Sequence, residues 1–241
     1  MGTLKSFHAE IGSGWAVLFS HPADYTPVCT TELGTVASLH DEFARRGVKL
    51  FALSIDDAAS HKGWVADIEA AEWSRGKTMG FPIIADVKGK IAKAYEMFDP
   101  AETDSKGNKL TARAVFFIKD KKLRAQLLYP ASSGRNFGEV LRLLDSLQLT
   151  DSHKVATPVN WTPGAKCMVL PTIPDAQARD MFPSVDYVDV PSGKKYLRMV
   201  DDPKSGAKPG AASALDELKK HLVPALAGLA GVALGAFARR K

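Results

Sequence analysis

Short apolar runs alternate with segments of helical periodicity through the first 150 residues, and this alternation most constrains the fold. Two of the runs, Trp15–Phe19 and Lys49–Ile55, have the length and composition of buried strands. Between them, residues 30–46 carry apolar side chains at helical spacing, and Gly47 ends the segment. Strands that alternate with helices in this way are typical of an α/β layer fold.

The second half of this region adds a hairpin. The apolar segments Ala114–Ile118 and Leu123–Tyr129 flank the polar turn at residues 120–122. Residues 60–72 and 137–149 have helical spacing, and residues 81–85 form another short apolar run. We therefore expect an α/β fold over residues 1–150, with a mixed central sheet flanked by helices.

The composition changes after residue 150. Residues 151–200 are richer in proline and predict a small C-terminal arm, and residues 201–212 predict a flexible linker. Residues 213–241 form an apolar tail in which residues 222–238 carry no charge. As a helix that stretch would span roughly 25 Å, less than the bilayer core of about 30 Å. Two interpretations stay open: a membrane anchor, or a partner-binding helix or disordered extension.

Charge and cysteine content narrow the function classes. The net charge is +5 and the basic residues are scattered, which argues against nucleic acid as a partner. The two cysteines do not make a disulfide framework, and no Cys/His spacing predicts a metal or another cofactor. With no apolar signal-peptide core near the N-terminus, we expect a cytoplasmic protein. The alternative is attachment to an organelle membrane through the tail, facing the cytosol.

The stretch Ser20–Gly34 places Cys29 at the start of a predicted helix, with the rigid Pro27 just before it and Thr26 three residues before it. A cysteine attacks as the thiolate, which is a minor species at neutral pH unless its surroundings favour it. The unpaired N–H groups and positive dipole end of a helix N-terminus do favour it. On spacing alone, the interpretation of Cys29 as a small buried hydrophobe is favoured, because a lone cysteine is more often buried and inert.

A resemblance separates these two interpretations. The pattern Pro22-x-x-x-Thr26-x-x-Cys29 resembles the active-site motif of the peroxiredoxins, and residues 21–33 resemble the 1-Cys, peroxiredoxin 6 type. The resemblance extends over roughly residues 5–200. Its further motifs include residues 111–116, 134–137, 155–158, 168–174 and 191–198. It implies a thioredoxin-like fold with a C-terminal arm used in dimerisation, so a homodimer is expected.

The resemblance also implies roles for individual residues. Cys29 would be the peroxidatic cysteine, Thr26 would bind and orient the peroxide, and Arg113 would stabilise negative charge. Four further residues are expected to form the pocket: His21, Pro22, Glu32 and Arg135. In this arrangement Glu32 would hold Arg135 beside Arg113.

The activity implied is reduction of hydrogen peroxide and of organic or lipid hydroperoxides through a cysteine sulfenic acid, in antioxidant defence and redox homeostasis. Cys167 lies in Ala165-Lys-Cys-Met, outside the Val-Cys-Pro setting of a resolving cysteine, and is expected to be structural. An external thiol, glutathione or another, would then be the reductant.

Two features depart from the family pattern. Where relatives carry a lipase-like Gly-Asp-Ser-Trp-Gly, this chain has Gly12-Ser-Gly-Trp-Ala16, so Gly14 stands at the nucleophile position and Ser13 is one place away. Neighbouring strand residues point to opposite faces, so we expect weak or no phospholipase activity although His8 and Asp120 match the partner positions. The Gly-Asp-x-Ala-Pro-Asn-Phe run that usually opens the family is also absent.

Overall fold

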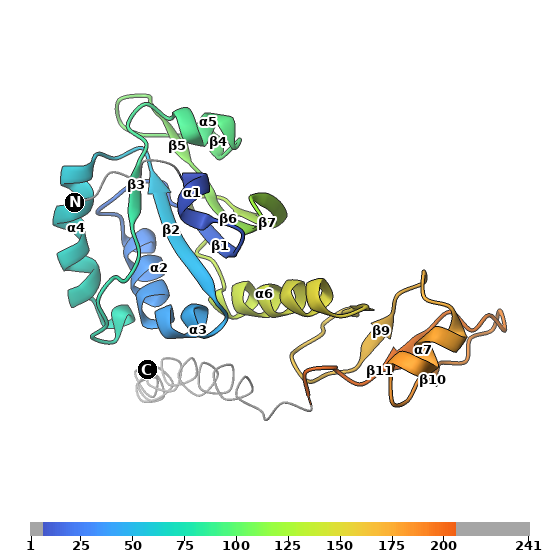
Figure 1. Cartoon of the computed structure of the whole chain (residues 1–241). Helices are drawn as coiled ribbons and strands as arrows, with labels where there is room; N and C mark the ends of the chain where they lie inside the picture. The colour runs from blue at the N-terminus through green and yellow to red at the C-terminus, as the bar shows by residue number, and fades with distance from the viewer. Residues whose placement is uncertain (1–6, 206–241) are drawn as a thin grey trace, which may run out of the picture. The chain divides into compact units, whose positions relative to one another are not determined.

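The computed structural model describes residues 7–205 (Figure 1). The chain divides into two compact units between Leu141 and Arg142, within helix α6 (Phe137–Ser152), and each unit is described by itself. The apolar tail predicted for 213–241 and most of the linker predicted for 201–212 lie outside the described residues. Among residues 7–205, no helix has the length and apolar character needed to cross a membrane.

The first unit is built on a five-stranded mixed sheet with the order β3-β2-β1-β6-β7, so β1 lies at its centre (Figure 1). Strand β1 pairs in parallel with β2, and β2 pairs in parallel with β3. On the other side β1 pairs antiparallel with β6, which continues through a tight turn into β7. The bounds are β1 Trp15–Ser20, β2 Val48–Ser54, β3 Ile83–Ala85, β6 Arg113–Lys119 and β7 Lys122–Tyr129. The predicted α/β fold with a mixed central sheet is confirmed.

Side chains alternate across β1, and each face of the sheet has its own helices. Leu18 belongs to a buried cluster with Ile11 of α1 (Phe7–Ile11) and Ala92 of α5 (Lys90–Ala94). Its neighbour Phe19 points to the opposite face, where its ring lies 6.2 Å from that of Phe43 and 5.8 Å from that of Phe137. The second face therefore carries α3 (His40–Arg45) and the start of α6.

The helix predicted over residues 30–46 is in fact two helices, and that prediction was wrong in its bounds. Helix α2 (Pro27–Ser38) begins earlier, so Cys29 lies within its first turn. The break comes at Leu39, whose N–H is shared between the carbonyls of Thr35 and Val36, a tightening typical of a helix end. Helix α4 (Ala58–Ala70) follows β2, lies beside α2 at the β3 side of the sheet (Figure 1), and leads into the 3₁₀ turn Glu72–Ser74.

A hairpin of β4 (Phe98–Thr103) and β5 (Lys109–Thr111) was not predicted from the sequence. Its tip is a turn in which the Asp104 carboxylate accepts backbone N–H groups from Lys106 and Asn108. The hairpin ends at Thr111, two residues before Arg113, the first residue of β6.

The second unit holds a four-stranded sheet with the order β10-β11-β9-β8. The bounds are β8 Val155–Ala156, β9 Cys167–Val169, β10 Asp186–Tyr187 and β11 Arg198–Val200, with helix α7 spanning Asp175–Met181. Leu149, Trp161 and Phe182 belong to its own buried cluster. The buried Arg198 donates to the carbonyls of Leu170 and Ile173 and to the carboxylate of Asp175, which ties β11 to the segment before α7.

Candidate active site

Cys29 lies in the first turn of α2, directly after the loop that leaves the carboxyl end of β1. This edge of an α/β sheet is where ligands generally bind. Cys29 is fully buried, at 0% exposure, while Pro27 occupies the first helical turn, where its missing N–H costs nothing. No side chain caps the helix N-terminus at Thr26, so backbone N–H groups near Cys29 stay available to a negative charge.

The guanidinium of Arg113 contacts the thiol directly, because its Nη1 lies 3.2 Å from the Cys29 Sγ. Arg113 is the first residue of β6, whose antiparallel pairing with β1 brings its start close to the end of β1. Its Nε and Nη2 both donate to the carbonyl of Ala131, at 3.0 and 2.6 Å. These bonds fix the plane of the guanidinium, so its remaining donors are held toward Cys29 and Glu32.

Glu32 joins the two arginines that were predicted to lie together. It follows Cys29 by three residues and so lies on the same side of α2. Its Oε2 accepts from Arg113 Nη1 at 2.9 Å and from Arg135 Nη2 at 2.7 Å, and its Oε1 accepts from the Nε and the backbone N–H of Arg135. Burial alone would raise the pKa of Glu32, but the charge and hydrogen bonds of Arg135, with Arg113, lower it.

Arg135 is a structural support of the site, with its side chain 0% exposed. Besides Glu32 it donates through Nη1 to the carbonyls of Ser20 and Ala114, at 2.9 and 2.8 Å. It thereby connects the ends of β1 and β6 to α2. Two buried arginines and one buried glutamate leave one positive charge beside Cys29, which a thiolate would neutralise.

Thr26 and Pro22 shape the loop before α2. The Thr26 hydroxyl donates to the carbonyl of Ala23 at 2.9 Å, which commits its proton and leaves its lone pairs free to accept. Pro22 is buried in the same loop. Tyr25, between them, has a φ of +54°, a backbone conformation that a non-glycine residue keeps only where its surroundings impose it.

His21 is buried, and it belongs to a polar network that the sequence did not reveal. Its Nε2 lies 3.0 Å from the Asp24 Oδ1, and the Nδ1 of His61 lies 2.7 Å from the Asp24 Oδ2. Burial lowers the pKa of His21, and the neighbouring Asp24 carboxylate offsets that effect only in part. The sequence signal for His61 was its place on the buried stripe of α4, with Trp64 and Ile68.

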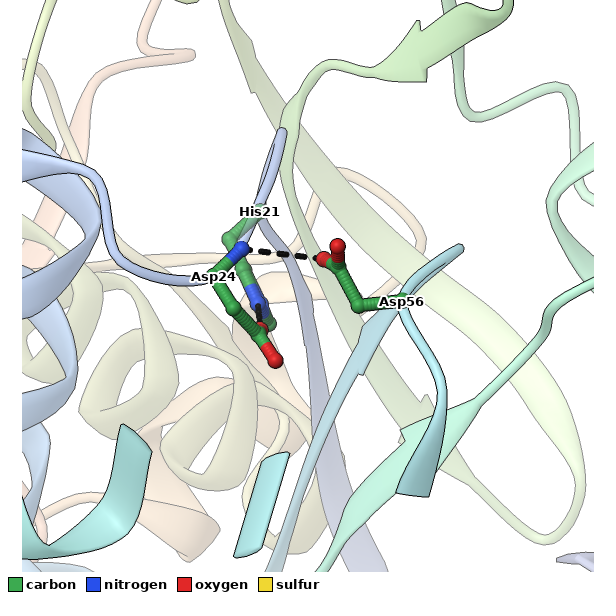
Figure 2. Close-up of side chains that lie close together, drawn as sticks. All are labelled: His21, Asp24 and Asp56. Carbon is green, nitrogen blue, oxygen red and sulfur yellow. Dashed lines mark hydrogen bonds and ion pairs between the residues drawn. The ribbon is translucent and has the colours of Figure 1, made fainter. Parts of the chain in front are cut away.

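His21, Asp24 and Asp56 bring potential metal-ligand atoms within 4.8 Å of one another (Figure 2). The atoms that face one another are already engaged in hydrogen bonds. The Asp24 backbone N–H donates to the Asp56 Oδ2 at 2.9 Å, and that oxygen also accepts from the Ser54 hydroxyl at 2.7 Å. The group is therefore organised as a hydrogen-bond network that holds the loop, and the geometry does not require a metal.

Cys167 has the properties of an inert thiol. It lies in β9 of the second unit at 0% exposure, and neither it nor Cys29 is in a disulfide. Burial, with the charge of Asp202, raises the pKa of Cys167 to about 11. It is protonated at neutral pH and so lacks the thiolate needed to attack another sulfur.

The residues that match a lipase-like set have other contacts. His8 meets the Tyr95 hydroxyl at 3.4 Å, and both line a cavity of about 300 Å³ between α1, α5, β6 and β7. Asp120 pairs with Lys119, which donates to the carbonyl of Ser13. In residues 7–205, no hydrogen bond joins His8, Ser13 and Asp120 to one another. Weak or absent phospholipase activity stays a prediction.

The shifted pKa values of His21 and Asp24 predict acid-sensitive stability. The pKa of His21 in the folded chain lies below its ordinary 6.5. As the pH falls below about 6.5, His21 therefore takes up a proton in the unfolded chain before it does so in the folded chain, and the free energy of unfolding decreases. The pKa of Asp24 is well below its ordinary 3.8, so the stability it provides is present above that value and lost below it. Each group can contribute up to about 1.4 kcal/mol per pH unit within its window.

Urea unfolding followed by tryptophan fluorescence should therefore show a decline in the free energy of unfolding from pH 7.5 to 5.0, and a further decline below about pH 4. A His21→Asn variant should have a flatter profile in the upper range and keep the lower decline. The same pH dependence in the variant and the parent chain would contradict the assignment to His21.

Comparisons with known proteins agree with this geometry. Residues 3–126 match the AhpC/TSA family, and residues 146–184 match the C-terminal domain of 1-Cys peroxiredoxin. The chain is 52% identical to peroxiredoxin-6 of Homo sapiens over 200 residues, which cover 82% of this chain and 89% of that relative. It is 51% identical to the 1-Cys peroxiredoxin of Onchocerca volvulus over 212 residues, covering 84% and 91%.

Solved structures lead to the same family. A cysteine-to-serine mutant of peroxiredoxin 6 from Arenicola marina superposes with a TM-score of 0.80 at 52% identity, covering 83% of this chain and 91% of that one. A yeast mitochondrial 1-Cys peroxiredoxin, described with glutathione/thioredoxin systems, gives a TM-score of 0.73 at 42% identity, covering 81% and 90%. The chain therefore belongs to the AhpC/TSA family, as a peroxiredoxin of the 1-Cys, peroxiredoxin 6 type.

Proposed function

We propose that Cys29 is the nucleophile through which this peroxiredoxin reduces hydrogen peroxide and organic hydroperoxides. The observation that carries the proposal is the contact of 3.2 Å between Arg113 Nη1 and the Sγ of Cys29, a residue that is 0% exposed. In such buried surroundings a fixed guanidinium interacts with a charge far more strongly than it would in water.

In the reaction, the Cys29 thiolate attacks one peroxide oxygen and forms an S–O bond while the O–O bond breaks. The leaving hydroxide or alkoxide takes up a proton and departs as water or alcohol, and Cys29 becomes a sulfenic acid. Arg113 stabilises the negative charge before and during the transfer. Because the Thr26 hydroxyl donates its hydrogen bond to the Ala23 carbonyl, its oxygen accepts a hydrogen bond from the peroxide O–H.

The sulfenic acid is returned to the thiol by an external reductant, for which we propose glutathione or another small thiol. Cys167 is an unfavourable internal partner because it is buried and its pKa is raised to about 11. The 1-Cys mechanism of the family agrees with this, since a yeast mitochondrial relative is described with glutathione/thioredoxin systems. We also propose a homodimer, because residues 146–184 match the C-terminal domain that the resemblance associates with dimerisation.

Oxidation with one equivalent of peroxide tests the assignment. Mass spectrometry after trapping with dimedone should find the sulfenic acid at Cys29 and an unmodified Cys167. On non-reducing gels, no disulfide between the two cysteines should accumulate. A stable disulfide between Cys29 and Cys167 would contradict the external reductant, and exclusive modification of Cys167 would contradict Cys29 as the nucleophile.

A further inference from the structure

The carboxylate of Asp24 is the centre of the polar network beside the active-site loop. Its side chain is 1% exposed and accepts from three groups: His21 Nε2 at 3.0 Å, His61 Nδ1 at 2.7 Å and the Ser60 hydroxyl at 2.7 Å. His21 and Asp24 belong to the loop that precedes Cys29 (Figure 2), whereas Ser60 and His61 belong to α4. One carboxylate thus joins the loop to a separate helix.

The protonation of this network follows from the charge of Asp24. Burial alone would raise the pKa of Asp24, but the hydrogen bonds from His21, His61 and Ser60 hold it well below its ordinary value. An ionised carboxylate can only accept, so each imidazole must carry its proton on the nitrogen that faces Asp24. His21 Nδ1 and His61 Nε2 are then the lone-pair nitrogens. Within residues 7–205 both of these buried atoms have no hydrogen-bond partner.

The same network holds the backbone that leads to Cys29. The Asp24 N–H is bound by Asp56, and the carbonyl of His21 accepts from the Thr111 hydroxyl at 2.6 Å. Between Asp24 and the helix lie Tyr25, in its left-handed conformation, and Thr26, the residue directly before α2. A strained residue at this position needs a fixed anchor, and Asp24 supplies it.

We propose that Asp24 and His61 are positioning residues of the peroxidase site. Asp24 holds a proton on His21 Nε2 and on His61 Nδ1 and locks the loop against α4, which sets the positions of Thr26 and Cys29. Neither residue contacts the Cys29 sulfur by hydrogen bonding. The inference rests on the proposed role of Cys29, and the experiment below separates the two.

Asp24→Asn is the decisive substitution because it keeps the shape and changes the hydrogen-bond chemistry. His21 and His61 bond to different oxygens of Asp24, and an amide in the same position replaces one of those oxygens with a donating NH₂ group, so it cannot accept from both imidazoles. The histidine that faces the amide nitrogen can keep a hydrogen bond only by changing its tautomer, so we expect at least one tautomer to switch. We expect the second-order rate of Cys29 oxidation by hydrogen peroxide, measured by stopped-flow fluorescence, to fall roughly 10- to 100-fold, by analogy with the loss of a group that orients a metal-binding histidine.

The matched control is Asp57→Asn, the same chemical change at the start of α4. Asp57 is exposed and caps α4 by accepting from Ala59 and Ser60 N–H groups, a role that asparagine performs equally well. Its oxidation rate should stay within about twofold of the parent chain. Cys29→Ser in the same assay tests the proposed function: if it still consumes peroxide, the assignment of Cys29 fails. A parental rate in Asp24→Asn with an inactive Cys29→Ser overturns only the positioning role.

Imidazole nitrogen NMR at pH 8 reports directly which nitrogen of each histidine carries the proton, independently of the oxidation rate. The parent chain should show His21 protonated at Nε2 and His61 protonated at Nδ1. In Asp24→Asn at least one of these tautomers should switch, while in Asp57→Asn neither should. Tautomers that are unchanged in folded Asp24→Asn, or mixed in the parent chain, would overturn the inference.

Two substitutions at His61 keep the proposal testable if Asp24→Asn does not fold. His61→Asn retains an N–H donor close to the position of Nδ1 and should keep most of the oxidation rate. His61→Leu removes the donor at similar volume and should lose roughly tenfold or more. Equal rates in these two variants would show that the bond from His61 to Asp24 has no part in positioning the site.

Discussion

Replacing Cys29 with serine is expected to lower peroxide reduction by about 10³-fold or more, to the level of the reaction without enzyme. Arg113 lies 3.2 Å from the Cys29 sulfur, and its positive charge can stabilise a thiolate there. A serine hydroxyl does not ionise near neutral pH, and its oxygen is a poor nucleophile toward a peroxide. The variant should fold normally, because serine is close to cysteine in size. Peroxide consumption with glutathione as reductant is the measurement.

Cys167→Ser is the matched control for this experiment, since it makes the same change at the other buried cysteine. It should retain nearly the parental rate, because Cys167 is a protonated thiol in the second unit. Loss of activity in Cys167→Ser with retention in Cys29→Ser would reverse the assignment. Loss in both folded variants would indicate an internal resolving step and contradict the external reductant.

The fold was largely predictable from local patterns. The buried runs that predicted β1 and β2 are apolar along their length, and the polar turn before Lys122 marked the β6–β7 hairpin. The β4–β5 hairpin was missed because β4 contains Pro100 and alternates little between apolar and polar residues. The break at Leu39 was missed because the apolar spacing of α2 continues into α3.

The site was predictable only in part, for a physical reason. Local sequence showed that Cys29 could lie at a helix N-terminus, but the charges around it come from distant positions. Arg113 and Arg135 were named through the family resemblance, and the structure brings them to Glu32 and Cys29. The pairing of Asp24 with His61 has no spacing rule, because it depends on how α4 packs beside the loop.

The largest effect expected outside Cys29 itself is at Arg113. Arg113→Lys keeps the positive charge but loses the planar fork that holds the Ala131 carbonyl, the Glu32 carboxylate and the Cys29 sulfur together. A lysine ammonium can pair with the Glu32 carboxylate or approach the Cys29 sulfur, but it lacks the additional nitrogens with which Arg113 binds the Ala131 carbonyl at the same time. We expect the rate of Cys29 oxidation to fall about 10²- to 10³-fold, the cost of losing one fixed donor to developing charge.

Arg179→Lys serves as the control, because Arg179 is exposed in α7 of the second unit and should tolerate the change with an unaltered rate. The pH dependence of oxidation then separates two roles of Arg113. If Arg113 acted only by favouring ionisation of the thiol, Arg113→Lys would recover the parental rate at high pH. If it also stabilises the charge that moves onto the leaving oxygen, a deficit should persist at every pH where Cys29 is ionised. The fixed guanidinium geometry predicts the second result, and full recovery at high pH would contradict it.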